Sequence, residues 1–148
     1  MSKVIIVFAS MSGNTEELAE AIAEGVRSAG LEPEFKNVMD ASASELADYD
    51  GILLGAYTWG DGDLPDEFMD FYDDMDDLKL EGRKSGVFGS ADSSYTHFGK
   101  AVDTLEEKLA ELGTEKVFDG FKVELNPSKD EKQQCRDLGA KFAAALGA

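Results

Sequence analysis

The chain has 148 residues, of which 43% are hydrophobic, so it is long and apolar enough to form a single domain spanning residues 1–148. This apolar content excludes a disordered acidic tail, and the lone cysteine, Cys135, excludes an intrachain disulfide or a cysteine-based metal cluster. A formal net charge of -17 repels phosphate backbones and anionic lipids, so we expect neither nucleic acid nor a membrane as a partner.

The first apolar segment, Val4–Phe8, is continuous rather than alternating, as in a parallel strand that is buried on both faces. It is too short and too β-branched for a signal peptide. No apolar run in the sequence is long enough to span a membrane, so we expect a cytoplasmic protein. An amphipathic helix is predicted next, because apolar residues recur every four positions at Leu18, Ile22 and Val26.

The turn between this strand and helix, FASMSGNT at residues 8–15, is rich in hydrogen-bond donors. Hydroxyl and amide side chains surround a single Gly13, and Met11 offers its backbone amide; the polar residues are Ser10, Ser12, Asn14 and Thr15. Free amides and a partial positive charge at a helix N-terminus make such a turn a nest for one terminal phosphate. It lacks the Gly-Lys-Ser/Thr ending of a nucleoside-triphosphate loop and the glycine pattern of dinucleotide folds. The alternative is that Ser12 or Asn14 only caps the helix.

The next two strands differ in burial. Segment 31–38 is polar and contains Pro33, which belongs on a sheet edge, whereas Ile52–Ala56 is apolar and is predicted to be central. Nine of the seventeen residues in Asp61–Asp77 are acidic, and this segment includes a helical repeat of Phe68, Phe71, Tyr72 and Met75.

The remaining segments continue the alternation of strands and helices. A third buried strand is predicted at Val87–Gly89, and an edge strand at 115–125 is interrupted by Asp119–Gly120. Helical apolar faces are formed by Val102, Leu105, Leu109 and Leu112, and by Cys135, Leu138, Phe142 and Leu146; Cys135 is therefore predicted to lie in the core.

This alternation predicts an α/β fold: a doubly wound, five-stranded parallel sheet of order 2-1-3-4-5 with helices on both faces. Such a sheet binds ligands beyond the carboxyl ends of strands 1 and 3, where the winding reverses. Two further loops emerge there, GAYTWGDGDLP at residues 55–65 and FGSADSSYTHF at residues 88–98. Each carries an aromatic residue at its tip, Trp59 or Tyr95, and a pair of facing aromatics suits a planar ring. A phosphate nest beside such a pair indicates a mononucleotide with a flat head group.

The chain resembles the short-chain flavodoxins over essentially its whole length. The resemblance rests on Ser10–Thr15 as the phosphate loop, on Thr58-Trp59-Gly60-Asp61 as the first flavin loop, and on Asp92-Ser93-Ser94-Tyr95 as the second. It implies FMN as the cofactor, with Trp59 and Tyr95 on opposite faces of the isoalloxazine ring. It also implies that the Gly60 carbonyl can turn toward flavin N5, a turn that glycine permits.

The residues that the resemblance implies for FMN binding are Ser10, Met11, Ser12, Gly13, Asn14, Thr15, Tyr57, Thr58, Trp59, Gly60, Asp61, Ser90, Ala91, Asp92, Tyr95 and Phe98. Two of them depart from the family pattern. Tyr57 stands where a small residue is frequent, and Ala91 stands where glycine is common. The only histidine, His97, is expected at the rim of the site and not as a base.

The function implied is a low-potential one-electron carrier without substrate turnover of its own. We expect basic-surfaced redox proteins to dock near Asp61–Asp77, and the protein to be a monomer. The absence of a cation from the phosphate nest keeps the field negative, which makes the last charge on a reduced flavin costly. Two alternatives remain: a small FMN-dependent NAD(P)H or quinone reductase on the same fold, and a phosphate-sensing regulatory domain. The latter would need an acidic pair where this chain has Ala9-Ser10.

Overall fold

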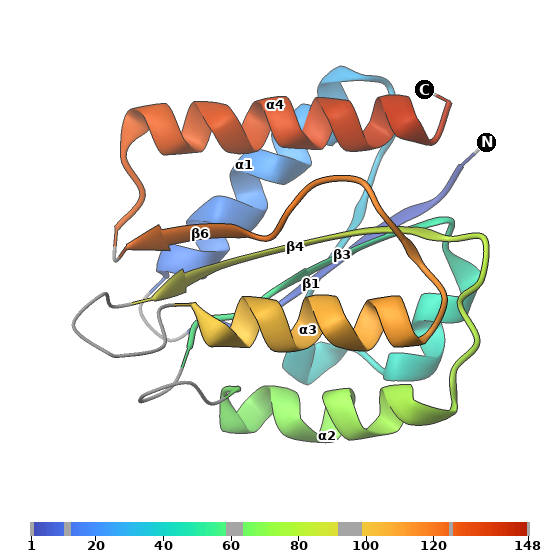
Figure 1. The fold of residues 1–148 in the computed structure, drawn as a ribbon. Helices are drawn as coiled ribbons and strands as arrows, with labels where there is room; N and C mark the ends of the chain where they lie inside the picture. The colour runs from blue at the N-terminus through green and yellow to red at the C-terminus, as the bar shows by residue number, and fades with distance from the viewer. Residues whose placement is uncertain (1, 11–12, 59–63, 92–98, 125, 148) are drawn as a thin grey trace.

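The computed structural model describes residues 2–10, 13–58, 64–91, 99–124 and 126–147 (Figure 1). Its strands are β1 (Val4–Phe8), β2 (Glu34–Asn37), β3 (Gly51–Gly55), β4 (Lys84–Ala91), β5 (Glu115–Lys116) and β6 (Phe121–Glu124). Its helices are α1 (Asn14–Ser28), α2 (Asp66–Asp74), α3 (Lys100–Glu111) and α4 (Lys129–Ala145), and short 3-10 turns cover Val38–Asp40, Ala43–Asp48 and Met75–Asp77. None of the helices within these ranges has both the length and the apolar character needed to cross a bilayer.

The strands form one sheet in the order β2-β1-β3-β4-β5, and β6 also pairs with β4. This order confirms the predicted order 2-1-3-4-5. Every pairing is parallel, as predicted. The fifth strand of the prediction consists of β5 and β6, which meet different parts of β4 on either side of residues 117–120.

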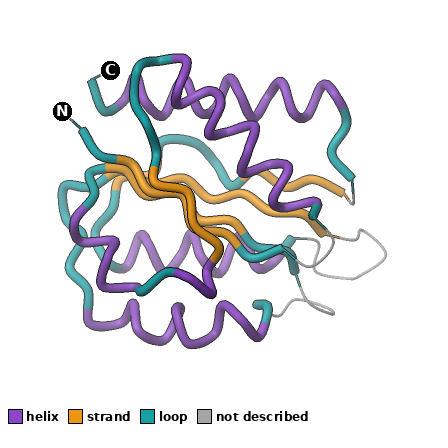
Figure 2. Tube along the Cα trace, turned by 180° about the vertical axis from the view of Figure 1, so that it is seen from behind, coloured by secondary structure: helices purple, strands orange, loops and turns teal. Residues whose placement is uncertain are grey.

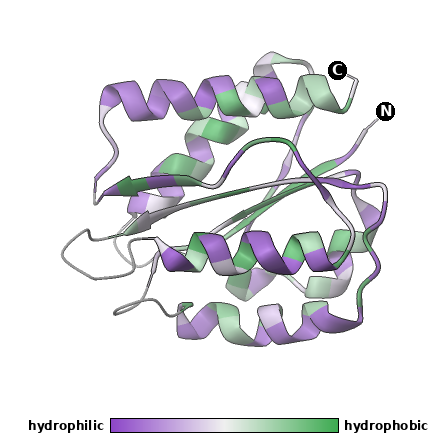
Figure 3. Cartoon of the chain, in the orientation of Figure 1, coloured by the Kyte–Doolittle hydropathy of each residue, from purple (hydrophilic) through white to green (hydrophobic). Residues whose placement is uncertain are grey.

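The sheet lies between two helical layers, with α1 and α4 on one face and α2 and α3 on the other (Figures 1 and 2). Alternate residues of a strand point to opposite faces, and the apolar run of β1 supplies both layers. Ile5 and Val7 pack with the apolar residues of α2 and α3, whereas Ile6 and Phe8 pack with those of α1 and α4. Figure 3 shows the same division as apolar helix faces turned toward the sheet.

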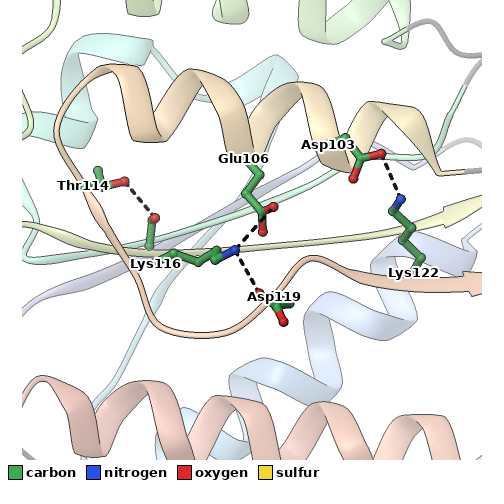
Figure 4. Close-up of polar contacts among 7 residues, drawn as sticks. Asp103, Glu106, Thr114, Lys116, Asp119 and Lys122 are labelled. Carbon is green, nitrogen blue, oxygen red and sulfur yellow. Dashed lines mark hydrogen bonds and ion pairs between the residues drawn. The ribbon is translucent and has the colours of Figure 1, made fainter.

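The break in the fifth strand is bridged by polar contacts to α3 (Figure 4). Lys116 Nζ lies 2.9 Å from Asp119 and 3.9 Å from Glu106, and Lys122 Nζ lies 2.9 Å from Asp103. Partly exposed ion pairs of this kind each contribute about 0–1 kcal/mol. These contacts therefore position residues 117–120 against α3 but contribute little to the stability of the fold.

Several predicted boundaries were wrong. β4 begins at Lys84 rather than Val87, because its polar first residues pair with Gly51–Ile52 on one side and Glu115–Lys116 on the other. The edge strand predicted at 31–38 is shorter, since β2 covers only Glu34–Asn37. Strand β3, at Gly51–Gly55, begins and ends one residue earlier than predicted.

Cys135 is fully buried on α4, as predicted, and its burial raises the pKa of its thiol from 9.0 to about 12. Between these two values the unfolded chain loses the thiol proton and the folded chain keeps it. We therefore expect Cys135 to lower stability by up to ~1.4 kcal/mol per pH unit as the pH rises above about 9. Urea denaturation of the wild type and Cys135→Ala at pH 8 and pH 10 measures this effect. Equal losses of stability in the two proteins would contradict it.

Candidate functional site

The carboxyl ends of β1, β3 and β4 meet at one edge of the sheet, beside the first turns of α1 and α3 (Figure 1). Backbone hydrogen bonds between neighbouring segments continue beyond the ends of these strands. The Ala9 amide donates to the Gly55 carbonyl at 2.9 Å, the Ala56 amide to Phe88 at 3.2 Å, and the Thr58 amide to Ser90 at 3.2 Å. The three chain segments that were predicted to surround a ligand thus leave the sheet side by side.

The start of α1 is shaped by Gly13 and Ser10. Gly13 is the N-cap with φ 90°, a left-handed conformation that favours glycine. The Ser10 hydroxyl oxygen accepts from the Gly13 amide at 3.1 Å and from the Glu16 amide at 3.3 Å. Asn14 is the first helical residue, so it is not the cap; Ser12, the other candidate of the alternative interpretation, lies outside the described residues. The amide ends of this helix face the edge at which the strands terminate.

Thr15 and Ser90 join the first loop to the end of β4. Thr15 is fully buried and Ser90 is 5% exposed, and their hydroxyl oxygens lie 2.7 Å apart. Either hydroxyl can donate in this pair. When Ser90 donates, the Thr15 proton is free to donate to a third group at the start of α1.

Thr58 joins the exit of β3 to α3. Its hydroxyl oxygen accepts from the Ala101 amide in the first turn of α3 at 3.2 Å, while its own amide is bound to the Ser90 carbonyl. Ala91, the last residue of β4, is buried and pairs with Glu124 of β6. Thr15, Thr58 and Ser90 thus form one hydrogen-bonded unit that links α1, β4 and α3.

Tyr57 directs its hydroxyl toward α2. The hydroxyl donates to Glu67 Oε1 at 2.5 Å, and the half-buried ring packs on the apolar cluster beneath α2 and α3. Burial, followed by the carboxylates of Glu67 and Asp66, raises the pKa of Tyr57 above its ordinary value of 10. The group therefore stays a hydrogen-bond donor throughout the physiological range.

The other predicted site residues lie outside the described residues: Met11, Ser12, Trp59, Gly60, Asp61, Asp92, Tyr95 and Phe98, together with His97. Sequence reasoning missed the roles of Glu67 and of the Ala101 amide. Their partners lie ten and 43 positions away in the chain, and neither spacing leaves a pattern in the sequence.

The surface next to this edge is strongly acidic. Helix α2 and the 3-10 turn after it expose Asp66, Glu67, Asp70, Asp73, Asp74, Asp76 and Asp77. One of these, Asp76, bonds the nearly buried Lys108 of α3, whose Nζ also lies 4.5 Å from the centre of the Tyr72 ring. Lys108 therefore holds the C-terminal end of the acidic segment against α3. This contact does not neutralise the carboxylates in the first turn of α2.

Known proteins match this chain in sequence and in fold. The family model described as flavodoxin matches residues 6–139. The probable flavodoxin 2 of Bacillus subtilis is 43% identical over 99% of this chain and 98% of its own length, and a flavodoxin of Maridesulfovibrio salexigens is 42% identical over 88% and 92%. The crystal structure of oxidised flavodoxin 1 from Bacillus cereus superimposes with a TM-score of 0.94 at 53% identity, covering 97% of this chain and 98% of that one. With the predicted strand order, a left-handed glycine at the start of α1 and these relatives over nearly its full length, the chain belongs to the flavodoxin family.

Proposed function

We propose that this protein is a low-potential one-electron carrier that holds FMN at the edge where β1, β3 and β4 end. Flavodoxins bind FMN and carry electrons between redox proteins, and do not turn over a substrate of their own. The observation that best supports the proposal is the bonded unit of Thr15, Thr58 and Ser90, because it brings together the three segments that the motifs assign to one ligand. Bound FMN supplies a ring that takes up and releases single electrons.

The described residues at the start of α1 fit a phosphate group. A left-handed Gly13 opens the first turn, the Ser10 hydroxyl orders the amides around it, and Thr15 has a hydroxyl proton to donate when Ser90 donates to it. We assign Ser10, Gly13, Asn14 and Thr15 to the phosphate, with Met11 and Ser12 completing the loop. These groups are neutral donors, so they bind a dianion through backbone and hydroxyl groups without adding a cation.

The ring end of the site is assigned to the exits of β3 and β4. Among the described residues these are Tyr57, Thr58, Ser90 and Ala91; the others are Trp59, Gly60, Asp61, Asp92, Tyr95 and Phe98. Trp59 and Tyr95 would stack on the two ring faces, and backbone groups near Asp92 would contact the pyrimidine edge. Carboxylates beside the ring, with no lysine or arginine in the phosphate loop, would lower the second reduction potential below that of free FMN.

Replacing Thr15 with alanine should weaken FMN binding about tenfold or more, because a hydrogen bond to a charged acceptor contributes ~1.5–3 kcal/mol. Riboflavin, which has no phosphate, should lose less affinity. Thr15→Ser keeps the hydroxyl and should bind FMN within about threefold of the wild type. Titration calorimetry of both ligands with the three proteins measures this, and equal losses for FMN and riboflavin would remove the phosphate assignment.

The carrier is distinguished from the reductase by turnover. A purified FMN-loaded carrier should oxidise NADH and NADPH negligibly until a redox partner protein is added. Rapid oxidation of either nucleotide by the protein alone would support the reductase.

The partners are proposed to present basic surfaces to the acidic segment at Asp61–Asp77. Seven described acidic residues of this segment are exposed, and charge complementarity chiefly raises the rate of association. The protein itself is proposed to be a cytoplasmic monomer folded as one domain over residues 1–148.

A further inference from the structure

Among the described residues, only two large apolar side chains are strongly exposed: Met39 is 74% exposed and Met69 is 41% exposed. One exposed apolar side chain is common on a protein surface. These two lie on elements that pack against each other, the 3-10 turn Val38–Asp40 and the helix α2. The residue before each methionine, Val38 or Phe68, is buried in one core cluster. The methionines therefore project from two adjoining elements toward solvent.

Both methionines lie near the edge of the sheet at which the candidate site is found. Phe8 pairs with Asn37 on one side and with Gly55 on the other, so β2 ends level with β1 and β3, and the 3-10 turn follows at once. The Asn37 Oδ1 atom accepts from the Met39 amide at 3.0 Å, which fixes the turn. Helix α2 begins at the same edge, and Met69 is its fourth residue (Figure 1). The surface that carries both side chains is therefore next to the proposed flavin site.

Carboxylates flank the two methionines. Asp66 and Asp73 are three residues before and four residues after Met69, so they share its face of the helix, and both are exposed. Asp40, which follows Met39 directly, is exposed as well. Protein interfaces are commonly built with an apolar centre and a polar rim. The two methionines and the carboxylates beside them have that composition.

Charge and apolar surface contribute differently to a complex between two proteins. Complementary charges raise the rate of association, but exposed ion pairs add little to affinity. Apolar surface that is buried on contact slows dissociation, and most differences in affinity between related complexes lie in the dissociation rate. Methionine suits such a contact, because its flexible, polarisable side chain adapts to surfaces of different shape. An acidic surface that must also hold its partner therefore needs apolar groups among its charges.

We propose that Met39 and Met69 are the apolar contact of the docking surface, and that the partner presents an apolar spot ringed by lysine or arginine side chains. This inference rests on the proposed function and deepens it. The carboxylates of α2 bring the partner to the surface, and the two methionines hold it there.

The test separates apolar contact from charge. The double variant Met39→Gln, Met69→Gln makes both side chains polar and keeps every charge. The matched control, Met39→Leu, Met69→Leu, keeps them apolar. Two cationic probes are compared: a cytochrome c, whose exposed haem edge lies among lysines, and polylysine, which offers charge without a folded apolar surface. Titration calorimetry of the FMN-loaded, oxidised proteins measures affinity without electron transfer, and a surface biosensor measures dissociation.

We expect the glutamine variant to bind cytochrome c about tenfold more weakly, chiefly through faster dissociation, because two apolar side chains are no longer buried. Its affinity should fall with salt as steeply as that of the wild type, since its charge is the same. It should bind polylysine within about twofold of the wild type. The leucine variant should stay within about twofold for both probes.

An unchanged affinity of the glutamine variant for cytochrome c would overturn the proposal. Equal losses for cytochrome c and polylysine would do so too, because polylysine has no folded apolar surface to lose. A wild-type protein that bound neither probe would also overturn it. A wild-type protein that bound no FMN would instead refute the proposed function, so the two failures are distinguishable.

Discussion

Replacing Gly139 with alanine is expected to lower the free energy of unfolding of the flavin-free protein by about 2–3 kcal/mol. A Cβ atom on Gly139 of α4 would lie 2.1 Å from the Ile22 carbonyl oxygen of α1, and one on Gly25 would lie 2.0 Å from the Arg136 carbonyl oxygen. Because both obstacles are backbone atoms, no side-chain rotation relieves them and the two helices must move apart. The better helix propensity of alanine recovers only about 1 kcal/mol.

This contact matters for function because α1 carries the proposed phosphate nest at its first turn. Moving α1 away from α4 should also weaken FMN binding, although the substitution is remote from the nest. Urea denaturation of the apoprotein measures the stability. Gln134→Ala, at an exposed position of α4, is the control and should stay within about 0.5 kcal/mol of the wild type. A similarly small change in Gly139→Ala would contradict the close helix contact.

Neutralising three carboxylates of α2 is expected to slow electron transfer to a basic acceptor about tenfold or more at low salt. The variant is Asp66→Asn, Glu67→Gln, Asp70→Asn, which removes three exposed charges and leaves an acceptor for Tyr57. The wild-type rate should fall steeply with ionic strength, because screening shortens the range of the attraction. The two proteins should converge at high salt.

Stopped-flow reduction of a cationic cytochrome c between about 10 mM and 1 M salt, on the order of a 30 Å to 3 Å screening length, measures this dependence. The matched control neutralises Glu20, Glu24 and Asp137, which are exposed on α1 and α4 over the opposite face of the sheet. It changes the net charge equally and should slow transfer much less. Equal slowing by the two triple variants would mean that net charge acts and that α2 is not the docking surface.

The architecture follows from local patterns in the sequence. Val4–Phe8 is a central strand because an unbroken apolar run suits burial on both faces, and the structure buries all five of its residues. The helix at Leu18, Ile22 and Val26 was predictable because a four-residue apolar repeat needs only one face of one element. The polar turn at residues 8–15 pointed to a phosphate because a helix N-terminus follows it directly.

Features that depend on two distant segments were not predictable in this way. Lys84 and Ser85 are polar and carry no strand pattern, yet they extend β4 because Gly51–Ile52 and Glu115–Lys116 flank them. The 3-10 turn at Ala43–Asp48 was not predicted, although Ser42 and Glu45 form a capping box at its start.

The sequence by itself determined the fold class, the strand order and the family, because each follows from the character of contiguous residues; the loops that would hold a ligand stay a prediction. Only the tertiary structure decided that Thr15 bonds Ser90, that Tyr57 bonds Glu67 and that Gly139 meets the backbone of Ile22. These contacts join residues from ten to 117 positions apart. Their existence depends on how the sheet and helices pack in space, which a linear pattern of polar and apolar residues does not specify.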